Sequence, residues 1–201
     1  HKNTDWDAMK FETCAHKFAD LSEGNFGVSL LNDCKYGHDI HNGEMLLSLL
    51  RSPAYPNPDT DQGRMSCVYA LVPHAGALDL PRISAMAYAL NNPMQVLPAM
   101  GEKNILPQMF FVVHADHTNI VCEVVKEAEE GDDFILRLYE NSNSKTKTVV
   151  TFGFDVASVS LCDMMEQELR KLPLIHNAVS LTFGAFEIHT LKVRIPCKQN
   201  H

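Results

Sequence analysis

The chain has 201 residues, of which 45% are hydrophobic and 21% charged, and this composition fits one large or two small globular domains. Its 25 acidic residues outnumber the 17 Lys and Arg residues, which gives a formal net charge of -8. No block of basic residues could neutralise a run of phosphates, and no apolar run approaches the roughly 20 residues of a membrane span. We therefore expect neither nucleic acid nor a membrane as a partner.

The six cysteines are spread at intervals of 20 or more residues without a Cys-x-x-Cys pair, which excludes zinc-ribbon and thioredoxin sites. We expect free thiols, because a chain of this length does not need disulfides. The sequence also has no Asn-x-Ser/Thr acceptor site and begins without an initiator Met or a secretion signal. We expect a cytoplasmic location and a chain cut from a longer polypeptide.

The first half of the chain predicts short strands separated by loops. Apolar runs at residues 26–31, 44–50 and 65–72 predict strands. The segment 52–63 between the second and third runs is rich in Pro and Asp, which predicts a loop.

One helical pattern lies at residues 81–91. Its apolar residues recur at positions i, i+3, i+4 and i+7, namely Ile83, Met86, Ala87 and Leu90. Pro81 fits the first turn and Asp79 lies near the N-cap. The residues 93–107 that follow contain three prolines and a glycine without a clear period, so we place a domain boundary there, between residues 1–99 and 108–201.

The second half predicts an antiparallel β-sandwich, because seven short apolar runs alternate with turn signals. The runs are residues 110–114, 119–126, 134–140, 146–152, 156–162, 179–183 and 186–195. In the last run the apolar phase changes near Thr190, which predicts a β-bulge. The segment 164–172 is ambiguous between a short helix and a loop. The predicted fold class is all-β with one short helix.

Two groups of His and Asp residues could bind a divalent metal ion: His38, Asp39 and His41, and His114, Asp116 and His117. Neither spacing matches a defined site, since only alternate residues of a strand converge. We favour polar residues that line turns. The segment 59–63 resembles half of a calcium loop but lacks the distal Glu, so a solvated loop is the preferred interpretation.

The sequence does not identify catalytic residues. Ser22 and Ser29 lie in no nucleophile elbow, and no Gly-rich phosphate loop precedes a helix. A carboxylate pair for glycoside chemistry could be drawn from four acidic residues whose separation the sequence does not fix: Asp20, Glu23, Asp33 and Asp39.

The richest polar cluster follows the strand predicted at residues 26–31. Asn32, Asp33, Lys35 and Tyr36 provide an amide, a carboxylate, an ammonium group and a phenol, which can hydrogen-bond the hydroxyls of a sugar. These four residues are the candidate substrate-binding site. The alternative is a hairpin loop capped by an Asx turn with Lys35 in solvent.

Several segments together resemble the C-terminal region of glycoside hydrolase family 38 alpha-mannosidases, in the cytosolic and bacterial branch. The matching segments occur in the expected order along nearly the whole chain, at residues 3–7, 10–12, 15–23, 27–37, 47–53, 61–63, 69–74, 136–140 and 181–183. The resemblance implies part of a β supersandwich in residues 1–99 and a terminal β-sandwich in residues 108–201. Phe18 stands where relatives often have Trp, which weakens an argument for sugar stacking at this position.

The resemblance also implies a retaining, zinc-dependent hydrolase whose nucleophile, acid and zinc ligands lie in a separate N-terminal catalytic domain. This chain would shape the rim of that active site, with Lys35 near a mannose-containing oligosaccharide, and would be inactive alone. It would hold no zinc itself. The alternative is an independent carbohydrate-binding or adhesion sandwich. That module would need an exposed aromatic platform, whereas Trp6 is the only Trp and aromatic residues make up 8% of the chain.

Overall fold

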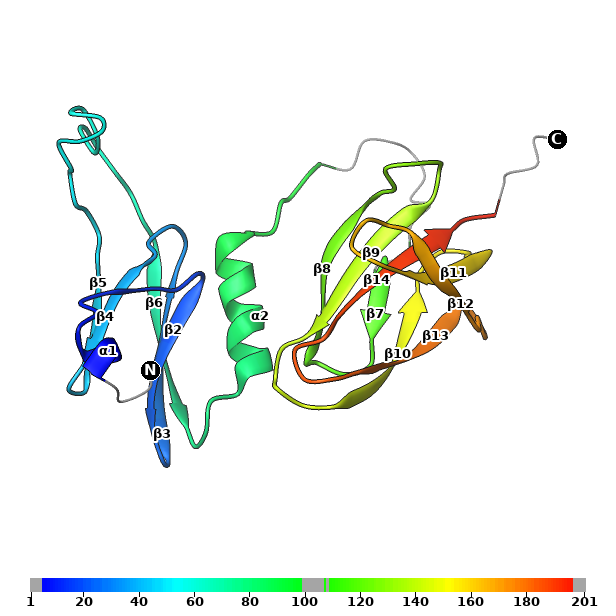
Figure 1. The fold of residues 1–201 in the computed structure, drawn as a ribbon, viewed down its shortest axis with the longest axis horizontal. Helices are drawn as coiled ribbons and strands as arrows, with labels where there is room; N and C mark the ends of the chain where they lie inside the picture. Colours follow the sequence, from blue (N-terminus) through cyan, green and yellow to red (C-terminus); the bar gives the residue numbers. More distant parts are fainter. Residues whose placement is uncertain (1–4, 99–106, 108, 197–201) are drawn as a thin grey trace. The chain divides into compact units, whose positions relative to one another are not determined.

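The computed structural model describes residues 5–98, 107 and 109–196, and the chain divides into two compact units, His1–Leu97 and Pro98–His201. Figure 1 follows the chain through both units. The division at residue 97 falls within the segment 93–107 in which the sequence predicts a boundary. Most of that segment lies outside the described residues. The assignment of residues 1–99 and 108–201 to two named domains stays a prediction.

The first unit contains two antiparallel sheets of three strands each. In chain order its elements are α1 (Asp5–Ala8), β1 (Thr13–Cys14), β2 (Phe18–Glu23), β3 (Phe26–Asn32), β4 (Gly37–His41), β5 (Glu44–Leu47), β6 (Tyr69–Ala75) and α2 (Leu80–Asn91). One sheet has the strand order β1-β4-β5 and the other β2-β3-β6. The predicted strands at residues 26–31, 44–50 and 65–72 correspond to β3, β5 and β6, whereas β1, β2 and β4 were not predicted.

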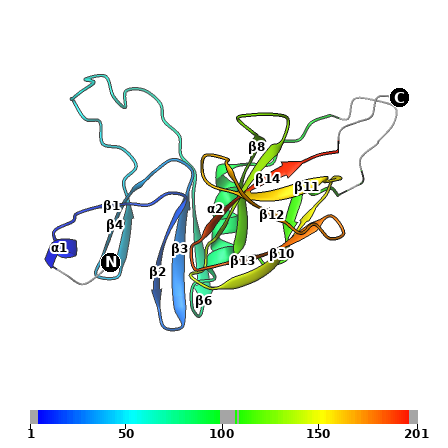
Figure 2. The ribbon, with the colours of Figure 1, turned by 45° about the vertical axis from the view of Figure 1, so that its right-hand side comes forward.

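Helix α2 packs on one face of the sheet β2-β3-β6, and Figure 2 shows it beside these strands. Leu31 of β3 and Ile83 and Ala87 of α2 form the buried core of this unit. The Asp79 side chain accepts a hydrogen bond from the Arg82 backbone at 3.2 Å, which confirms the predicted cap. Met86 does not join the buried face as its spacing suggested, because it lies 38% exposed.

The opposite face of the sheet β2-β3-β6 is apolar and only partly covered in this unit, because Leu30 on it is buried and β5 contributes Met45 and Leu47 to the same groove. Side chains alternate between the two faces of a strand, so Phe26, Tyr69 and Leu71 lie on this face, with exposed fractions of 50%, 56% and 64%. We call the exposed part of this face the uncovered face. A groove there has a volume of about 260 Å³ and is lined by Leu30, Met45, Leu47, Leu49, Tyr69 and Leu71.

The second unit is a two-sheet antiparallel β-sandwich, which confirms the all-β prediction for this half. Its elements are β7 (Val113–Ala115), β8 (Ile120–Glu127), β9 (Phe134–Glu140), β10 (Thr146–Phe152), β11 (Ser158–Cys162), β12 (Glu168–Leu172), β13 (Ala178–Phe183) and β14 (Ile188–Arg194). The sheets have the orders β13-β10-β7 and β12-β11-β14-β9-β8. Buried residues of both sheets form one core, including Leu136, Val150, Phe183 and Leu191.

Two predictions in this half are wrong. The segment 164–172 forms neither a helix nor a mere loop, because Glu168–Leu172 pairs with β11 as an edge strand. The register of β14 runs without a shift through Thr190, so no bulge lies there. The apolar phase changes because the buried imidazole of His189, stacked on Phe183 with ring centroids 4.3 Å apart, occupies the core-facing position while Ile188 faces out.

No helix in the described ranges is long and apolar enough to cross a bilayer.

Candidate functional site

The predicted site lies in the connection from β3 to β4, and Asn32 fixes its start. The Asn32 backbone N–H donates to the carbonyl of Lys17 at 2.9 Å, and its own carbonyl accepts from the Asn91 side chain at 2.9 Å. The Asn32 side-chain oxygen accepts from the Lys35 backbone N–H at 2.9 Å, which confirms the Asx turn of the alternative interpretation. The predicted hairpin is wrong, because β3 and β4 belong to different sheets. Asn32 is 1% exposed. The loop is therefore tied to β2 and to the last turn of α2.

Asp33 and Lys35 interact within this loop. The Asp33 backbone N–H donates to the carbonyl of Val68 at 3.1 Å. Hydrogen bonds from the Cys34 thiol and the Val68 backbone hold the pKa of the Asp33 carboxyl below its ordinary value, and the charge of Lys35 contributes in the same direction. The alternative interpretation placed Lys35 in solvent, but its side chain is half-buried.

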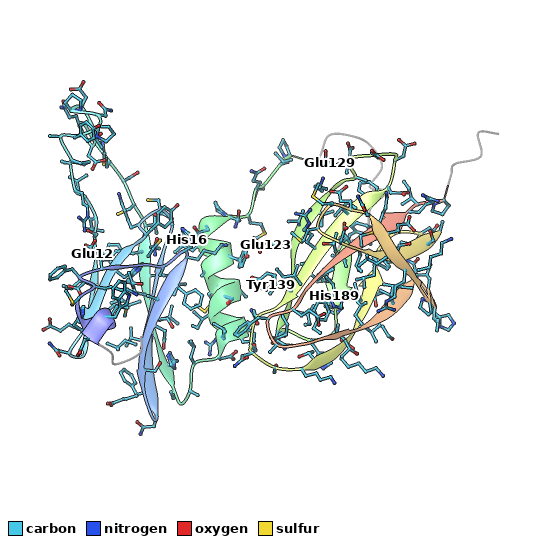
Figure 3. All side chains as sticks on the ribbon, in the orientation of Figure 1. Glu12, His16, Glu123, Glu129, Tyr139 and His189 are labelled. Carbon is cyan, nitrogen blue, oxygen red and sulfur yellow. The ribbon has the colours of Figure 1, made fainter. Side chains whose placement is uncertain are left out.

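Tyr36 leads from the loop into β4. Its ring is exposed and lies edge-on to His16, which Figure 3 labels, with 4.8 Å between ring centroids. Its carbonyl accepts from the Ala15 backbone at 3.0 Å and lies 3.2 Å from Nδ1 of His38. Because a carbonyl oxygen can only accept, Nδ1 of His38 carries the proton in that contact. Nε2 is therefore an acceptor in neutral His38.

Three buried polar atoms in residues 32–38 have no hydrogen-bond partner in the described part of the protein: Asn32 Nδ2, Asp33 Oδ1 and His38 Nε2. An unpaired buried polar group costs about 1–3 kcal/mol, so such atoms pair with water or a ligand. They are a donor, an acceptor and an imidazole nitrogen, and all three are shielded from solvent. The accessible polar groups of the loop, which can hydrogen-bond hydroxyl groups of a polyol, belong to half-buried Lys35 and exposed Tyr36.

The structure brings the first predicted metal group onto a strand and not into a turn. In β4, His38 is fully buried, while Asp39 and His41 lie on the other face and contact each other through His41 Nδ1 and Asp39 Oδ1. This corrects the turn interpretation of these residues. The strand pairs with β1 and β5, which uses its backbone in the sheet.

Asp116 of the second group anchors a turn to β10. It accepts hydrogen bonds from the Thr148 hydroxyl at 2.5 Å, the Val149 backbone at 2.9 Å and the His117 ring at 2.8 Å. These bonds, that of Thr148 first, hold the pKa of Asp116 well below its ordinary value. His114 lies in β7 and pairs with Thr151.

The zinc that the resemblance implies does not fit this chain's described residues. Across residues 5–98, 107 and 109–196, no three His, Cys, Asp or Glu side chains converge to hold a metal ion. In the predicted half calcium loop, Asp61 accepts a hydrogen bond from the Ser52 backbone at 2.9 Å and so closes the loop on itself.

The sequence missed a second polar cluster, on the face of β2-β3-β6 that packs against α2. Asp20 accepts hydrogen bonds from Ser29 at 2.6 Å and His74 at 2.9 Å, and also contacts Ser22. Burial opposes ionisation, but these hydrogen bonds prevail and lower the pKa of Asp20. A Cβ atom at Gly27 would lie 2.5 Å from the His74 ring, so this position needs glycine.

The sequence contains a pattern for only part of this second cluster. Asp20 and Ser22 alternate along β2, as Gly27 and Ser29 do along β3, which places all four on one face once the strands pair. His74 joins them through the pairing of β6 with β3, across more than 40 residues of sequence. Asp20 thus interacts with three neighbours, Ser22, Ser29 and His74, none of which is a carboxylate.

Comparison with known proteins gives a consistent family. The model for the glycosyl hydrolases family 38 C-terminal domain matches residues 1–59, and that for the family 38 C-terminal beta sandwich domain matches residues 119–191. Alpha-mannosidase 2C1 from Homo sapiens is 38% identical over 196 residues, and alpha-mannosidase from Saccharomyces cerevisiae is 31% identical over 211 residues. The matches cover 95% and 98% of this chain but 19% of each relative.

A solved structure has a similar fold. An alpha-mannosidase from Enterococcus faecalis V583 superposes with a TM-score of 0.70 at 16% identity, over 90% of this chain and 21% of that one. A family 38 glycosyl hydrolase from Enterococcus faecalis gives a TM-score of 0.72 at 13% identity. At these identities the likeness concerns the fold alone. The chain spans about a fifth of the length of the curated relatives it matches.

Proposed function

The chain belongs to the C-terminal region of glycosyl hydrolase family 38, and we propose that it is part of an alpha-mannosidase that hydrolyses terminal alpha-mannosyl linkages. Relatives named alpha-mannosidase, at 31–38% identity along 95% or more of this chain, support this proposal. The parent enzyme would be a retaining hydrolase. Its nucleophile, acid and zinc ligands would lie in an N-terminal catalytic domain of the same polypeptide.

The loop of residues 32–37 would form part of the rim of that active site. The observation that supports this assignment is the accessible part of the polar loop, where Lys35 is half-buried and Tyr36 is exposed. Lys35 would add a charge-assisted hydrogen bond, and Tyr36 an exposed ring face.

The uncovered face supports the proposed contact with the rest of the polypeptide. Exposed Phe26, Tyr69 and Leu71 form an apolar surface with a groove beside it, and such surfaces mark contacts with other protein. The relatives are about five times as long as this chain, so the preceding part of the same polypeptide is the proposed partner. A cytoplasmic location of the parent enzyme stays an expectation from the resemblance to the cytosolic branch.

The test is the substitution Lys35→Ala in the full-length parent enzyme. We expect kcat/KM for an aryl alpha-mannoside to fall about tenfold to a hundredfold, because a hydrogen bond to a charged group contributes about 1.5–3 kcal/mol. The melting temperature should stay within about 1 °C, since the substitution leaves the backbone bond from Lys35 to Asn32 in place.

The matched control is Lys145→Ala, which removes an exposed lysine from the other unit. It should change neither kcat/KM nor the melting temperature. If Lys35→Ala matches this control in kcat/KM, the loop is only a connection between the two sheets and the assignment of the rim is wrong. The 201-residue chain alone should not hydrolyse the same aryl mannoside, and turnover above a blank would place catalytic residues within it.

A further inference from the structure

Two cysteines lie just beyond the paired ends of β3 and β6, Cys34 after β3 and Cys67 before β6. The register of these strands runs to Asn32 opposite Tyr69. The 3.1 Å bond from the Asp33 backbone N–H to the carbonyl of Val68 continues the pairing by one residue. The next opposed positions in this register are Cys34 and Cys67.

This placement suits a disulfide. Directly opposed residues of antiparallel strands have Cα atoms about 4.5–5.5 Å apart, and disulfides join residues whose Cα atoms are about 4.4–6.8 Å apart. The hydrogen bond to Asp33 is the main cause that raises the pKa of the Cys34 thiol, and the charge of Cys67 adds a small contribution in the same direction, which agrees with neighbouring side chains. Both thiols are free in this structure.

Reagents in solution can reach the pair. Cys34 is exposed and Cys67 is half-buried, whereas Cys162 is buried in the core of the second unit. Cys14 of β1 is also exposed, but the residue opposite it on β4 is Gly37, so no second thiol faces it. It offers a matched control for accessibility without an opposed thiol.

We propose that Cys34 and Cys67 form a reversible disulfide when the protein meets glutathione disulfide or a similar small-molecule disulfide. The Cys34 thiolate attacks one sulfur of glutathione disulfide, which forms a mixed disulfide and releases one glutathione. The Cys67 thiolate then attacks the Cys34 sulfur and releases the second glutathione. The two cysteines lose two electrons and two protons, and glutathione disulfide is reduced to two glutathione molecules. This step is independent of the proposed alpha-mannosidase activity.

The surroundings of Cys34 set the pH dependence of the reaction. Its hydrogen bond to Asp33, partial burial and the charge of Cys67 raise the pKa of the thiol, while Lys35 acts in the opposite direction. Only the thiolate attacks a disulfide, so the rate should rise about tenfold between pH 7 and pH 8.

The experiment incubates the full-length parent enzyme with excess glutathione disulfide, alkylates the remaining thiols and digests with trypsin without reduction. Cleavage at Lys and Arg yields residues 18–35 with Cys34 as the sole cysteine and residues 65–82 with Cys67 as the sole cysteine. We expect mass spectrometry to find these two peptides joined with the loss of two hydrogen atoms. Dithiothreitol should separate them.

Two variants sharpen the result. With Cys67→Ser, Cys34 should carry one glutathione in place of the link, and with Cys14→Ser the link should form as in the unsubstituted protein. Separate glutathione adducts on Cys34 and Cys67 in the unsubstituted protein would overturn the proposal. So would a link from Cys34 to Cys14, or unmodified Cys34 and Cys67 under conditions that modify Cys14.

Discussion

The two units differ in how completely each buries its apolar side chains. In the sandwich, 12 buried residues from both sheets form one core, whereas the first unit buries a cluster of three, Leu31, Ile83 and Ala87. The first unit leaves part of the other face of the sheet β2-β3-β6 uncovered, with Leu71 64% exposed. A sheet needs cover on its apolar face, so the sandwich meets this need itself and the first unit requires further protein.

The largest expected effect tests the closed core of the sandwich. Phe183→Ala removes a fully buried ring between the two sheets and should lower the free energy of unfolding of this unit by about 3–5 kcal/mol. Urea denaturation followed by circular dichroism measures it. Phe186→Ala, at an exposed ring, should cost within about 0.5 kcal/mol. Equal effects of the two substitutions would contradict a single packed core.

A second prediction concerns the buried carboxylate that joins three loops of the sandwich. Glu140 is fully buried and accepts hydrogen bonds from Asn119 at 2.9 Å, the Ser142 backbone at 2.7 Å and the Phe186 backbone at 3.0 Å. Glu140→Gln replaces one acceptor oxygen by a donor and removes the charge. It should lower the free energy of unfolding by about 2 kcal/mol in urea denaturation at pH 7. An unchanged value would show that these bonds contribute nothing net.

The same carboxylate should make the stability of the folded protein depend on pH. Burial raises the pKa of Glu140, but the hydrogen bonds outweigh it and lower the pKa to about 2. Because the folded pKa lies below the unfolded one, the stabilisation is present above about pH 4.5 and is lost as the pH falls toward 2. Glu140→Gln should flatten that part of the stability profile. If the stability of Glu140→Gln falls with pH as steeply as that of the unsubstituted protein, other carboxylates cause the loss of stability at low pH.

The smallest expected effect tests the uncovered face of the first unit. Leu71→Ser should change the melting temperature of the 201-residue chain by less than about 1 °C, because the side chain is mostly exposed there. In the full-length parent the same substitution should cost about 2 kcal/mol if preceding residues cover this face. Differential scanning calorimetry of both proteins decides it. An equally small change in both would mean that the face stays bare in the parent enzyme.

Most strands of the sandwich could be predicted because apolar residues alternate within each of them. β12 could not, since Glu168, Arg170 and Lys171 are exposed at a sheet edge and give no apolar pattern. β2 failed for a related reason, because its Asp20 pairs with Ser29 and His74 on other strands, and β4 failed because His38, Asp39 and His41 interrupt the apolar pattern. Their structure depends on pairing between distant segments, which local periodicity does not encode.

The candidate site was predictable in its position and its turn, but not in its unpaired atoms. The residue types of Asn32, Asp33 and Lys35 located the loop and predicted the Asx turn. Burial of Asn32 and His38 depends on neighbouring strands and α2, so the sequence could not tell which of their atoms lack a partner. His38 entered the sequence analysis as a metal candidate, and the structure places it in β4 beside the loop instead.

The close contact of Gly27 with His74 has a consequence for sequence variation. Any side chain at position 27 would overlap the imidazole ring, so the two positions cannot vary independently. A descendant sequence could gain alanine at position 27 only after, or together with, a smaller residue at position 74. That replacement would also leave the Asp20 carboxylate without one of its hydrogen bonds, so the exchange would require a third change on β2.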